Sequence, residues 1–149
     1  LPILEKDGYP FFAGVNLEVG NVLYQYEQSR YGAEARFILG KHVDKWLFVV
    51  NPIFGHALSQ PYRNDGPNFS LAARASREVT PELALGVEYY SDIGLLNQSI
   101  GFQQTGQAAF LMAYWEGKPF SFQFGVGKGL TQNTDSLTVK GIISIPLPD

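Results

Sequence analysis

Apolar and polar residues alternate with a period of two along most of this chain. The clearest case is residues 83–90, which split into a large apolar set and a smaller, more polar set: Leu83, Leu85, Val87 and Tyr89 against Ala84, Gly86, Glu88 and Tyr90. Residues 31–40, 69–76 and 120–127 repeat this split. Because successive side chains of a β-strand point to opposite faces, the pattern predicts strands with one continuous apolar face.

Turn residues divide the chain into eight predicted strands, with bounds near 11–21, 30–41, 45–54, 68–78, 82–91, 105–116, 119–128 and 136–147. The connections alternate in length: those at 42–44, 79–81 and 117–118 are short, and those at 22–29, 55–67, 92–104 and 129–135 are longer. Outer-membrane barrels have short turns on one rim and long loops on the other. We therefore predict one all-β domain over residues 1–149, an up-and-down antiparallel β-barrel with both ends at the short-turn rim.

The small-residue face indicates which side of the predicted sheet meets lipid. Gly, Ala and Ser dominate it, with a few charges of both signs, which is an unusual surface for a soluble protein. A barrel interior accommodates small residues, and charges there are tolerated when they pair. Residues 47–53 and 108–114 are apolar on both faces and leave their orientation open. We predict a transmembrane barrel whose apolar face contacts the bilayer and whose interior holds six charged residues: Glu18, Glu34, Arg36, Arg74, Glu88 and Lys140.

The charged interior has two interpretations. As a structural network, it ties the wall together and fixes the strand register; as a conduction path, it lines a route for a small solute. About eight strands leave an interior filled by side chains, which favours the structural role. Further strands, in a larger barrel of which this chain is a part, would open the lumen and favour conduction. The sequence leaves the solute or lipid and the oligomeric state open.

Two tryptophans fall beside predicted short turns. Trp46 follows the turn at 42–44 and Trp115 precedes the turn at 117–118, so both are expected at the same rim. Amphipathic Trp rings are enriched at membrane–water interfaces. The spacing predicts interfacial rings, and the alternative is that both fill the core of a soluble protein.

Several short segments resemble a family of uncharacterised Gram-negative proteins described as outer-membrane, transporter-like barrels. The resemblance spans most of the chain and rests on FAGVNLE (12–18), EARFILG (34–40), NPI (51–53), GVEYYSDIG (86–94) and GVGKGLT (125–131), with Lys140. It implies an outer-membrane location and a barrel fold, with no established activity. Members of that family are longer, with strands before the first one here. The resemblance thus implies a short member or the C-terminal part of a larger barrel.

The composition argues against a nucleic-acid partner, a cysteine-based site and a membrane-spanning helix. The formal net charge is −3 and no run of Lys or Arg appears, so the basic surface that a nucleic-acid partner needs is missing. The chain has no cysteine and therefore no disulfide framework or thiolate metal site. No apolar run approaches the ~20 residues of a membrane-spanning helix. The chain starts at Leu1 without a basic, apolar leader, so we expect the exported form to have lost its signal peptide.

Catalytic signals are weak. Ser91 and Asp92 end the fifth predicted strand, and His56 is expected near the same long-loop rim. A Ser activated by a His and oriented by an acid can cleave acyl chains. The stretch Tyr90-Ser91-Asp92 loosely resembles the motif of lipid A deacylases, whose His stands two residues before the Ser. Tyr89 occupies that position here and is not a general base at neutral pH. The alternative is that Ser91 and Asp92 simply begin a loop.

Three functions from different classes follow, in order of preference. The first is a non-enzymatic bacterial outer-membrane barrel, either a porin-like channel or a surface-structural protein. The second is a soluble or periplasmic calycin-like barrel that binds an apolar ligand, and the third is an outer-membrane acyl hydrolase. No metal or other cofactor is predicted, because His42 and His56 lie at opposite ends of the third strand and no cluster has ligand spacing. The stretch 125–129 lacks the spacing of a phosphate-binding loop.

Overall fold

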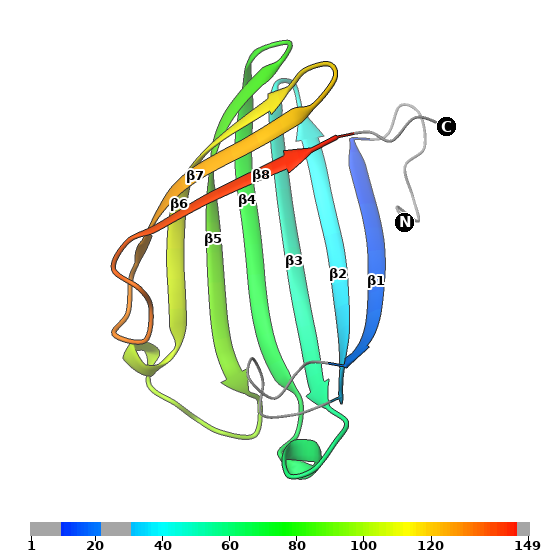
Figure 1. Ribbon diagram of the computed structural model, residues 1–149, viewed down its shortest axis with the longest axis vertical. Coiled ribbons are helices and arrows are strands. Elements are labelled where there is room, and N and C mark those ends of the chain that lie inside the picture. The colour runs from blue at the N-terminus through cyan, green and yellow to red at the C-terminus, as the bar shows by residue number, and fades with distance from the viewer. Residues whose placement is uncertain (1–9, 22–30, 146–149) are drawn as a thin grey trace.

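The computed structural model describes residues 10–21 and 31–145, which form eight strands in one antiparallel sheet (Figure 1). Each strand pairs with the next along the chain. The strands are β1 (Phe11–Asn21), β2 (Tyr31–Val43), β3 (Trp46–Ala57), β4 (Asn68–Thr80), β5 (Leu83–Leu95), β6 (Gly106–Glu116), β7 (Ser121–Gly129) and β8 (Thr138–Ser144). Two short 3₁₀ turns, η1 (Tyr62–Asn64) and η2 (Phe102–Gln104), complete the described elements. The predicted all-β, up-and-down fold is confirmed.

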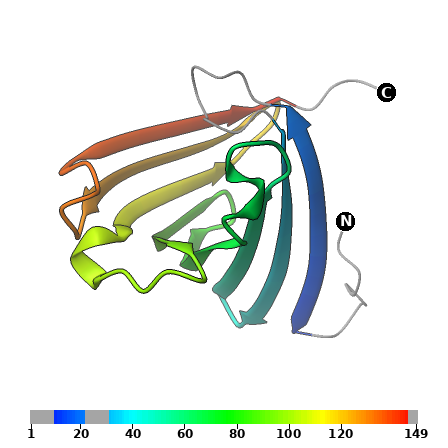
Figure 2. The same cartoon turned by 90° about the horizontal axis from the view of Figure 1, so that it is seen from below.

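The sheet curves strongly but does not close on itself. Seen from below, β1 and β8 form its two edges (Figure 2). No pairing joins β1 to β8 among the described residues. This open wall is compatible with the predicted larger barrel. Within the described residues, no helix has the length and apolar character needed to cross a membrane.

The connections separate onto two rims, as predicted. Short turns join β2 to β3, β4 to β5 and β6 to β7 at one rim, and the longer connections that carry η1 and η2 lie at the opposite rim (Figure 1). The β2–β3 turn is closed by Asp44, whose φ of 50° is in the left-handed region that Asp tolerates. The predicted loop at 22–29 lies outside the described residues, as does the predicted end of the last strand beyond residue 145.

Most strand bounds agree with the prediction to within two residues. β3 ends three residues later than predicted, at Ala57, β8 ends three residues earlier, at Ser144, and β5 differs most. The pattern predicts its end at residue 91, whereas the strand continues to Leu95. Ser91 pairs with Leu71 of β4 and with Gln107 of β6, so both neighbours hold the chain extended beyond this point. A shift of register between Phe69 and Ser70 accommodates the extra residues. The interpretation that Ser91 and Asp92 begin a loop is therefore wrong, because tertiary pairing overrides the turn preference of these residues.

The register assigns one side of every strand to the concave face of the sheet. Lys140 of β8 contacts Glu88 of β5, three strands away, which is possible only across that face. Following the pairs outward from Glu88 places Arg74, Val49 and Phe110 on the same face. The two strands that the sequence left open are thereby oriented, β3 with its odd-numbered residues inward and β6 with its even-numbered residues inward.

The small core lies inside the curve. Phe110, Met112 and Tyr114, alternate residues of β6, are the buried large hydrophobic residues of the described chain. Most other large apolar side chains remain exposed on the convex face. A soluble sheet would bury its large apolar face, so this distribution is the reverse of the ordinary one.

Candidate functional site

All six predicted interior charges lie on the concave face. Register pairs connect them through the sheet, including Glu18 with Glu34 and Arg74 with Glu88. They do not form one cluster, however. Glu18, Glu34 and Arg36 lie on β1 and β2, whereas Arg74, Glu88 and Lys140 lie on β4, β5 and β8. The concave wall therefore carries two separate groups of charged residues.

Glu88 is the centre of the second group. Its carboxylate accepts hydrogen bonds from the Tyr90 and Tyr114 hydroxyls, each at 2.7 Å, and from the Lys140 ammonium. Lys140 also donates to the Tyr90 hydroxyl at 2.8 Å. The Glu88 side chain is 11% exposed and that of Lys140 is 25% exposed. Such burial is stable only because each charge is paired and hydrogen-bonded.

Arg74 joins this group through an aromatic ring rather than through a carboxylate. Its guanidinium carbon lies 3.4 Å from the centroid of the Tyr114 ring, and its Nε donates to Ser76 Oγ at 3.0 Å. Within the described residues, Arg74 forms no ion pair. Cation–π stacking of this kind stabilises a partly desolvated guanidinium. The sequence placed Arg74 correctly on the face but did not identify its partner.

Two glycines of β7 make the contact between β5 and β8 possible. Gly127 pairs with Phe110, and Gly125 pairs with both Met112 and Lys140. A Cβ on Gly127 would lie 2.3 Å from the Phe110 ring, and one on Gly125 would lie 2.2 Å from the Met112 sulfur. The β6 side chains therefore lean over β7, where no side chain opposes them. This close approach supports the tight curvature that brings Lys140 to Glu88.

Gly86 of β5 lies even closer to its neighbouring strand. A Cβ there would lie 2.5 Å from the Ala75 carbonyl oxygen and 2.8 Å from the Ser76 Cα, and neither backbone atom can move aside cheaply. We expect Gly86→Ala to lower the free energy of unfolding by about 1–3 kcal/mol, the usual cost of overpacking. Gly32→Ala is the matched control on the same face, because its nearest atom is 3.7 Å away. Denaturant titration of both variants in detergent measures the difference, and equal midpoints would contradict the predicted steric contact.

The first charged group is more exposed and more acidic. Glu34 forms an ion pair with Arg36 at 2.9 Å, with the two side chains 35% and 39% exposed. Glu18 lies directly opposite Glu34 and accepts a hydrogen bond from Asn16 Nδ2 at 2.7 Å. Within the described residues, two ion pairs join predicted interior charges: Arg36–Glu34 within β2, and Lys140–Glu88 across the concave face.

A hollow of about 890 Å³ lies at the long-loop rim, beside this first group. Polar and ionisable residues of its lining include Glu18, Glu34, Asp65, Asn68 and Ser70. A smaller hollow of about 150 Å³ lies at the short-turn rim, where Arg74 and Tyr114 contribute to its wall. The Glu88 group thus lies between two hollows at opposite ends of the concave face.

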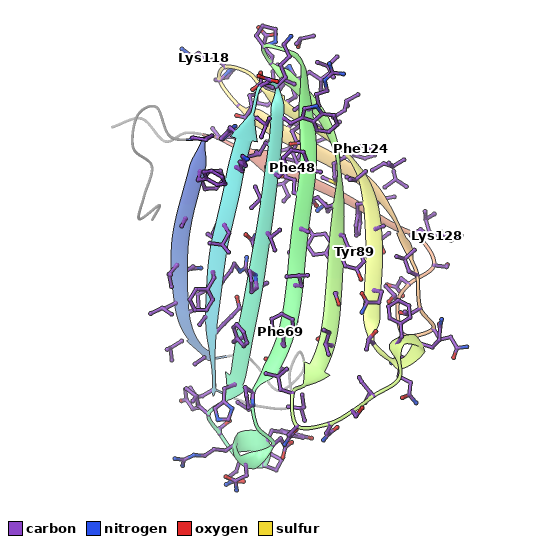
Figure 3. All side chains as sticks on the ribbon, turned by 180° about the vertical axis from the view of Figure 1, so that it is seen from behind. Phe48, Phe69, Tyr89, Lys118, Phe124 and Lys128 are labelled. Carbon is purple, nitrogen blue, oxygen red and sulfur yellow. The ribbon has the colours of Figure 1, made fainter. Side chains whose placement is uncertain are left out.

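The convex face is apolar over the middle of every strand. Figure 3 shows Phe48 of β3 toward the short-turn rim and Phe69 of β4 toward the long-loop rim, with Tyr89 on β5 and Phe124 on β7. The register gives this face Lys41 and Arg77 near the short-turn rim and Lys128 near the long-loop rim. Between them, no described position of the convex face carries a charged side chain. A charge-free apolar band therefore runs across the convex face from β1 to β8.

Both tryptophans lie on the convex face near the short-turn rim, as predicted. Trp46 begins β3, stacks on Phe48 at a centroid distance of 5.8 Å and lies under the Arg77 guanidinium. Trp115, one residue before the end of β6, contacts Phe120 at 5.2 Å. The other end of the band has its own aromatic cluster, in which Phe54 contacts Phe37 on one side and Phe69 on the other.

The structure does not bring Ser91, Asp92 and His56 together as a catalytic triad. Ser91 is buried on the convex side of β5, and Asp92 points to the concave side, where it accepts a hydrogen bond from Ser70. His56 is on β3, and β4 separates that strand from β5. Adjacent residues of a strand point to opposite faces, so Ser91 and Asp92 cannot share a reaction centre while β5 stays extended.

Sequence reasoning missed two groups of polar residues. Tyr90 and Tyr114 are partners of Glu88. The inward parity of Tyr90 on β5 was an available signal, whereas the orientation of β6, which carries Tyr114, was left open by the sequence. The second group is a buried cluster on the convex side near the long-loop rim, where Gln107 accepts from the Tyr89 hydroxyl and donates to Thr105 at 2.8 Å. Thr131 lies in the same cluster and donates to the Thr105 carbonyl oxygen at 2.7 Å. This cluster depends on the fold of the 130–135 connection, which alternation does not reveal.

Among the described residues, no three His, Cys, Asp or Glu side chains are placed to hold a metal ion. Comparison of the chain with known protein families, with curated proteins and with solved structures found no match. The resemblance to outer-membrane, transporter-like barrels therefore stays a prediction from the sequence. The function has to be argued from the two faces of the sheet.

Proposed function

We propose that this chain forms the wall of a bacterial outer-membrane β-barrel that acts as a porin-like channel for small polar solutes or ions. The observation that carries the proposal is the inversion of the sheet. Large apolar side chains cover the convex face, and small and charged residues cover the concave face. Lipid outside and water inside make such a wall stable, whereas water on both sides would not.

Strand lengths and rim chemistry support a membrane-spanning wall. Six strands, β1 to β6, have 11 to 13 residues, and a tilted membrane strand needs roughly 9–11. Aromatic side chains gather at both ends of the apolar band, as in the girdles of outer-membrane barrels. Lys41 extends its ammonium over the Phe11 ring, a position from which a long cationic side chain can reach the headgroups.

The open concave face favours conduction over a packed structural core. Eight strands closed on themselves would leave an interior just filled by side chains. Here only three large hydrophobic residues of the described chain are buried, and the hollow at the long-loop rim measures about 890 Å³. Because β1 and β8 do not pair among the described residues, we propose that further strands complete the wall and that the charged residues then line a solute path. The calycin-like alternative is disfavoured, because an apolar ligand would meet Arg36, Glu34 and Arg74 inside.

Single-channel recording in a planar bilayer tests this function. The refolded protein is expected to give discrete conductance steps, and a folded, inserted protein that stays silent would contradict the channel. Membrane insertion is established independently if the protein is extracted from cells only by detergent and if its mobility on a gel changes on heating. A monomer folded in plain buffer would contradict the membrane assignment itself.

Ion selectivity supplies a sharper prediction. Among the described residues, Glu18 and Glu34 line the large hollow and Arg36 is paired with Glu34, so the native channel is expected to prefer cations. Replacing both residues by Gln should move the reversal potential in a salt gradient toward zero. Lys128→Gln is the control, because Lys128 lies on the convex face. A shift of equal size in the control would show that Glu18 and Glu34 do not set the selectivity.

A further inference from the structure

The convex face of the described strands carries cations but no carboxylates near the short-turn rim. Lys41 of β2 and Arg77 of β4 point outward there, and both are exposed. Neither residue forms an ion pair within the described part of the chain. Asp44 and Glu82 belong to the turns beyond the strand ends. The carboxylates of the described strands all point to the concave face: Glu18, Glu34, Glu78, Glu88, Asp92 and Glu116.

Aromatic rings hold these two cations at the end of the apolar band. Trp46 and Phe48 of β3 stack on each other between β2 and β4. Arg77 lies opposite Trp46 in the register, and its guanidinium carbon is 5.9 Å from the centroid of that ring. Lys41 lies opposite Phe48, and its Nζ is 4.7 Å from the centroid of the Phe11 ring. We call Lys41, Arg77 and Trp46 together the cationic rim site.

The depth of this site in the proposed wall is the depth of lipid headgroups. Trp rings prefer the membrane–water interface, and long cationic side chains extend from there toward the phosphates. A guanidinium can donate two parallel hydrogen bonds to a phosphate, and an ammonium adds a point charge. A zwitterionic headgroup brings its own cation, so its net attraction to two positive side chains is weaker than that of an anionic one.

The rest of the chain does not supply such an attraction. The formal net charge is −3, so the overall field of the protein opposes contact with an anionic surface. Near the long-loop rim the convex side of the described strands carries one cation, Lys128 (Figure 3). Both tryptophans lie at the short-turn rim instead. A preference for anionic lipid therefore has to come from the cationic rim site.

We infer that the cationic rim site binds the phosphate headgroup of an anionic phospholipid in the leaflet at the short-turn rim. The inference rests on the proposed membrane-spanning wall and adds the class of lipid that this wall selects. The phosphate would lie between the Lys41 ammonium and the Arg77 guanidinium, and the acyl chains would cover the apolar band below Trp46.

Quenching of fluorescence by brominated lipid tests the site, because Trp46 is part of it and the chain has only two tryptophans. A Trp115→Phe background leaves Trp46 as the single reporter. The protein is refolded into vesicles of equal amounts of phosphatidylcholine and phosphatidylglycerol. The bromine is carried near the headgroup end of the acyl chains of one lipid or of the other. The lipid composition is then identical in both samples, and only the lipid that bears the quencher differs.

Brominated phosphatidylglycerol is expected to quench Trp46 more strongly than brominated phosphatidylcholine does. The attraction of one Lys or Arg to an anionic membrane surface corresponds to roughly a five-fold preference, which salt should weaken. Lys41→Gln combined with Arg77→Gln should make the two lipids quench equally. Lys41→Arg combined with Arg77→Lys keeps both charges and should keep the preference. Lys128→Gln, at the opposite rim, should also keep it.

Equal quenching by the two lipids before either cation is changed would overturn the inference. A preference that survives the double Gln substitution, or that is lost equally in Lys128→Gln, would overturn it too, because the selecting charges would then lie elsewhere. In all three cases Trp46 is still quenched, so the membrane assignment stands. Absence of quenching by both lipids in the folded protein would overturn the membrane assignment and, with it, the lipid site.

Discussion

Leu111→Arg is expected to lower the free energy of unfolding in lipid vesicles by about 2–4 kcal/mol, the cost of a cation on the lipid face near the bilayer midplane. Leu111 is 72% exposed on the convex face of β6. It lies in a row of outward aliphatic residues between Val87 and Val126, near the middle of the strands. The arginine would have to be taken out of water there, which is the source of the penalty.

The matched control places the same residue at the rim. Val43 is also exposed and outward, but it lies beside the β2–β3 turn. Val43→Arg should cost only about 0–1 kcal/mol, because the lipid-face penalty falls toward the interfaces. Chemical denaturation of both variants in vesicles measures the two costs. If Leu111→Arg is as stable as the parent, the convex face does not contact lipid.

Glu88→Gln is expected to lower the free energy of unfolding by about 3 kcal/mol, an effect similar to that of Leu111→Arg. The substitution leaves the Lys140 ammonium partly buried without its carboxylate. Glu88 also accepts hydrogen bonds from the Tyr90 and Tyr114 hydroxyls, so three donors share this one side chain. The penalty should lie at the low end of the range for broken buried pairs, because Lys140 retains some exposure.

Glu34→Gln provides the comparison on the same face. Its ion pair with Arg36 has similar chemistry but is more than a third exposed on both sides, so its loss should cost at most about 1 kcal/mol. A double variant, Glu88→Gln with Lys140→Met, should lose less free energy of unfolding than the sum of the losses of the two single variants, by about 1–3 kcal/mol. Equal costs for the two glutamates, together with additive behaviour of the double variant, would contradict a buried network around Glu88.

Alternation in the sequence was sufficient to predict eight strands, their order and the inward face. It worked because the period of two is a direct consequence of strand geometry, and because the convex residues in the middle of β4, β5 and β7 are apolar. β3 and β6 were not resolved by alternation. Their inward residues include the apolar Val49 and Phe110, and Phe110 belongs to the small core inside the curve.

The openness of the sheet could not be predicted from the residue pattern. Alternation fixes which face a residue occupies but not how many strands close the wall. The partners of the interior charges were also missed, since they depend on curvature. Lys140 reaches Glu88 only because Gly125 and Gly127 leave room over β7. The hydrolase hypothesis relied on Ser91, Asp92 and His56 meeting near the long-loop rim. The register instead directs Ser91 and Asp92 to opposite faces of β5.

Accessibility of adjacent alanines tests the central claim most directly, namely that the apolar convex face meets lipid and the concave face meets water. Ala72 and Ala108 point to the concave face, and their chain neighbours Ala73 and Ala109 point to the convex face. Each is replaced by Cys, which changes size little, and the refolded protein in vesicles is treated with a charged, membrane-impermeant thiol reagent. The account predicts labelling at 72 and 108 and protection at 73 and 109. Labelling at 73 and 109 with protection at 72 and 108 would contradict it.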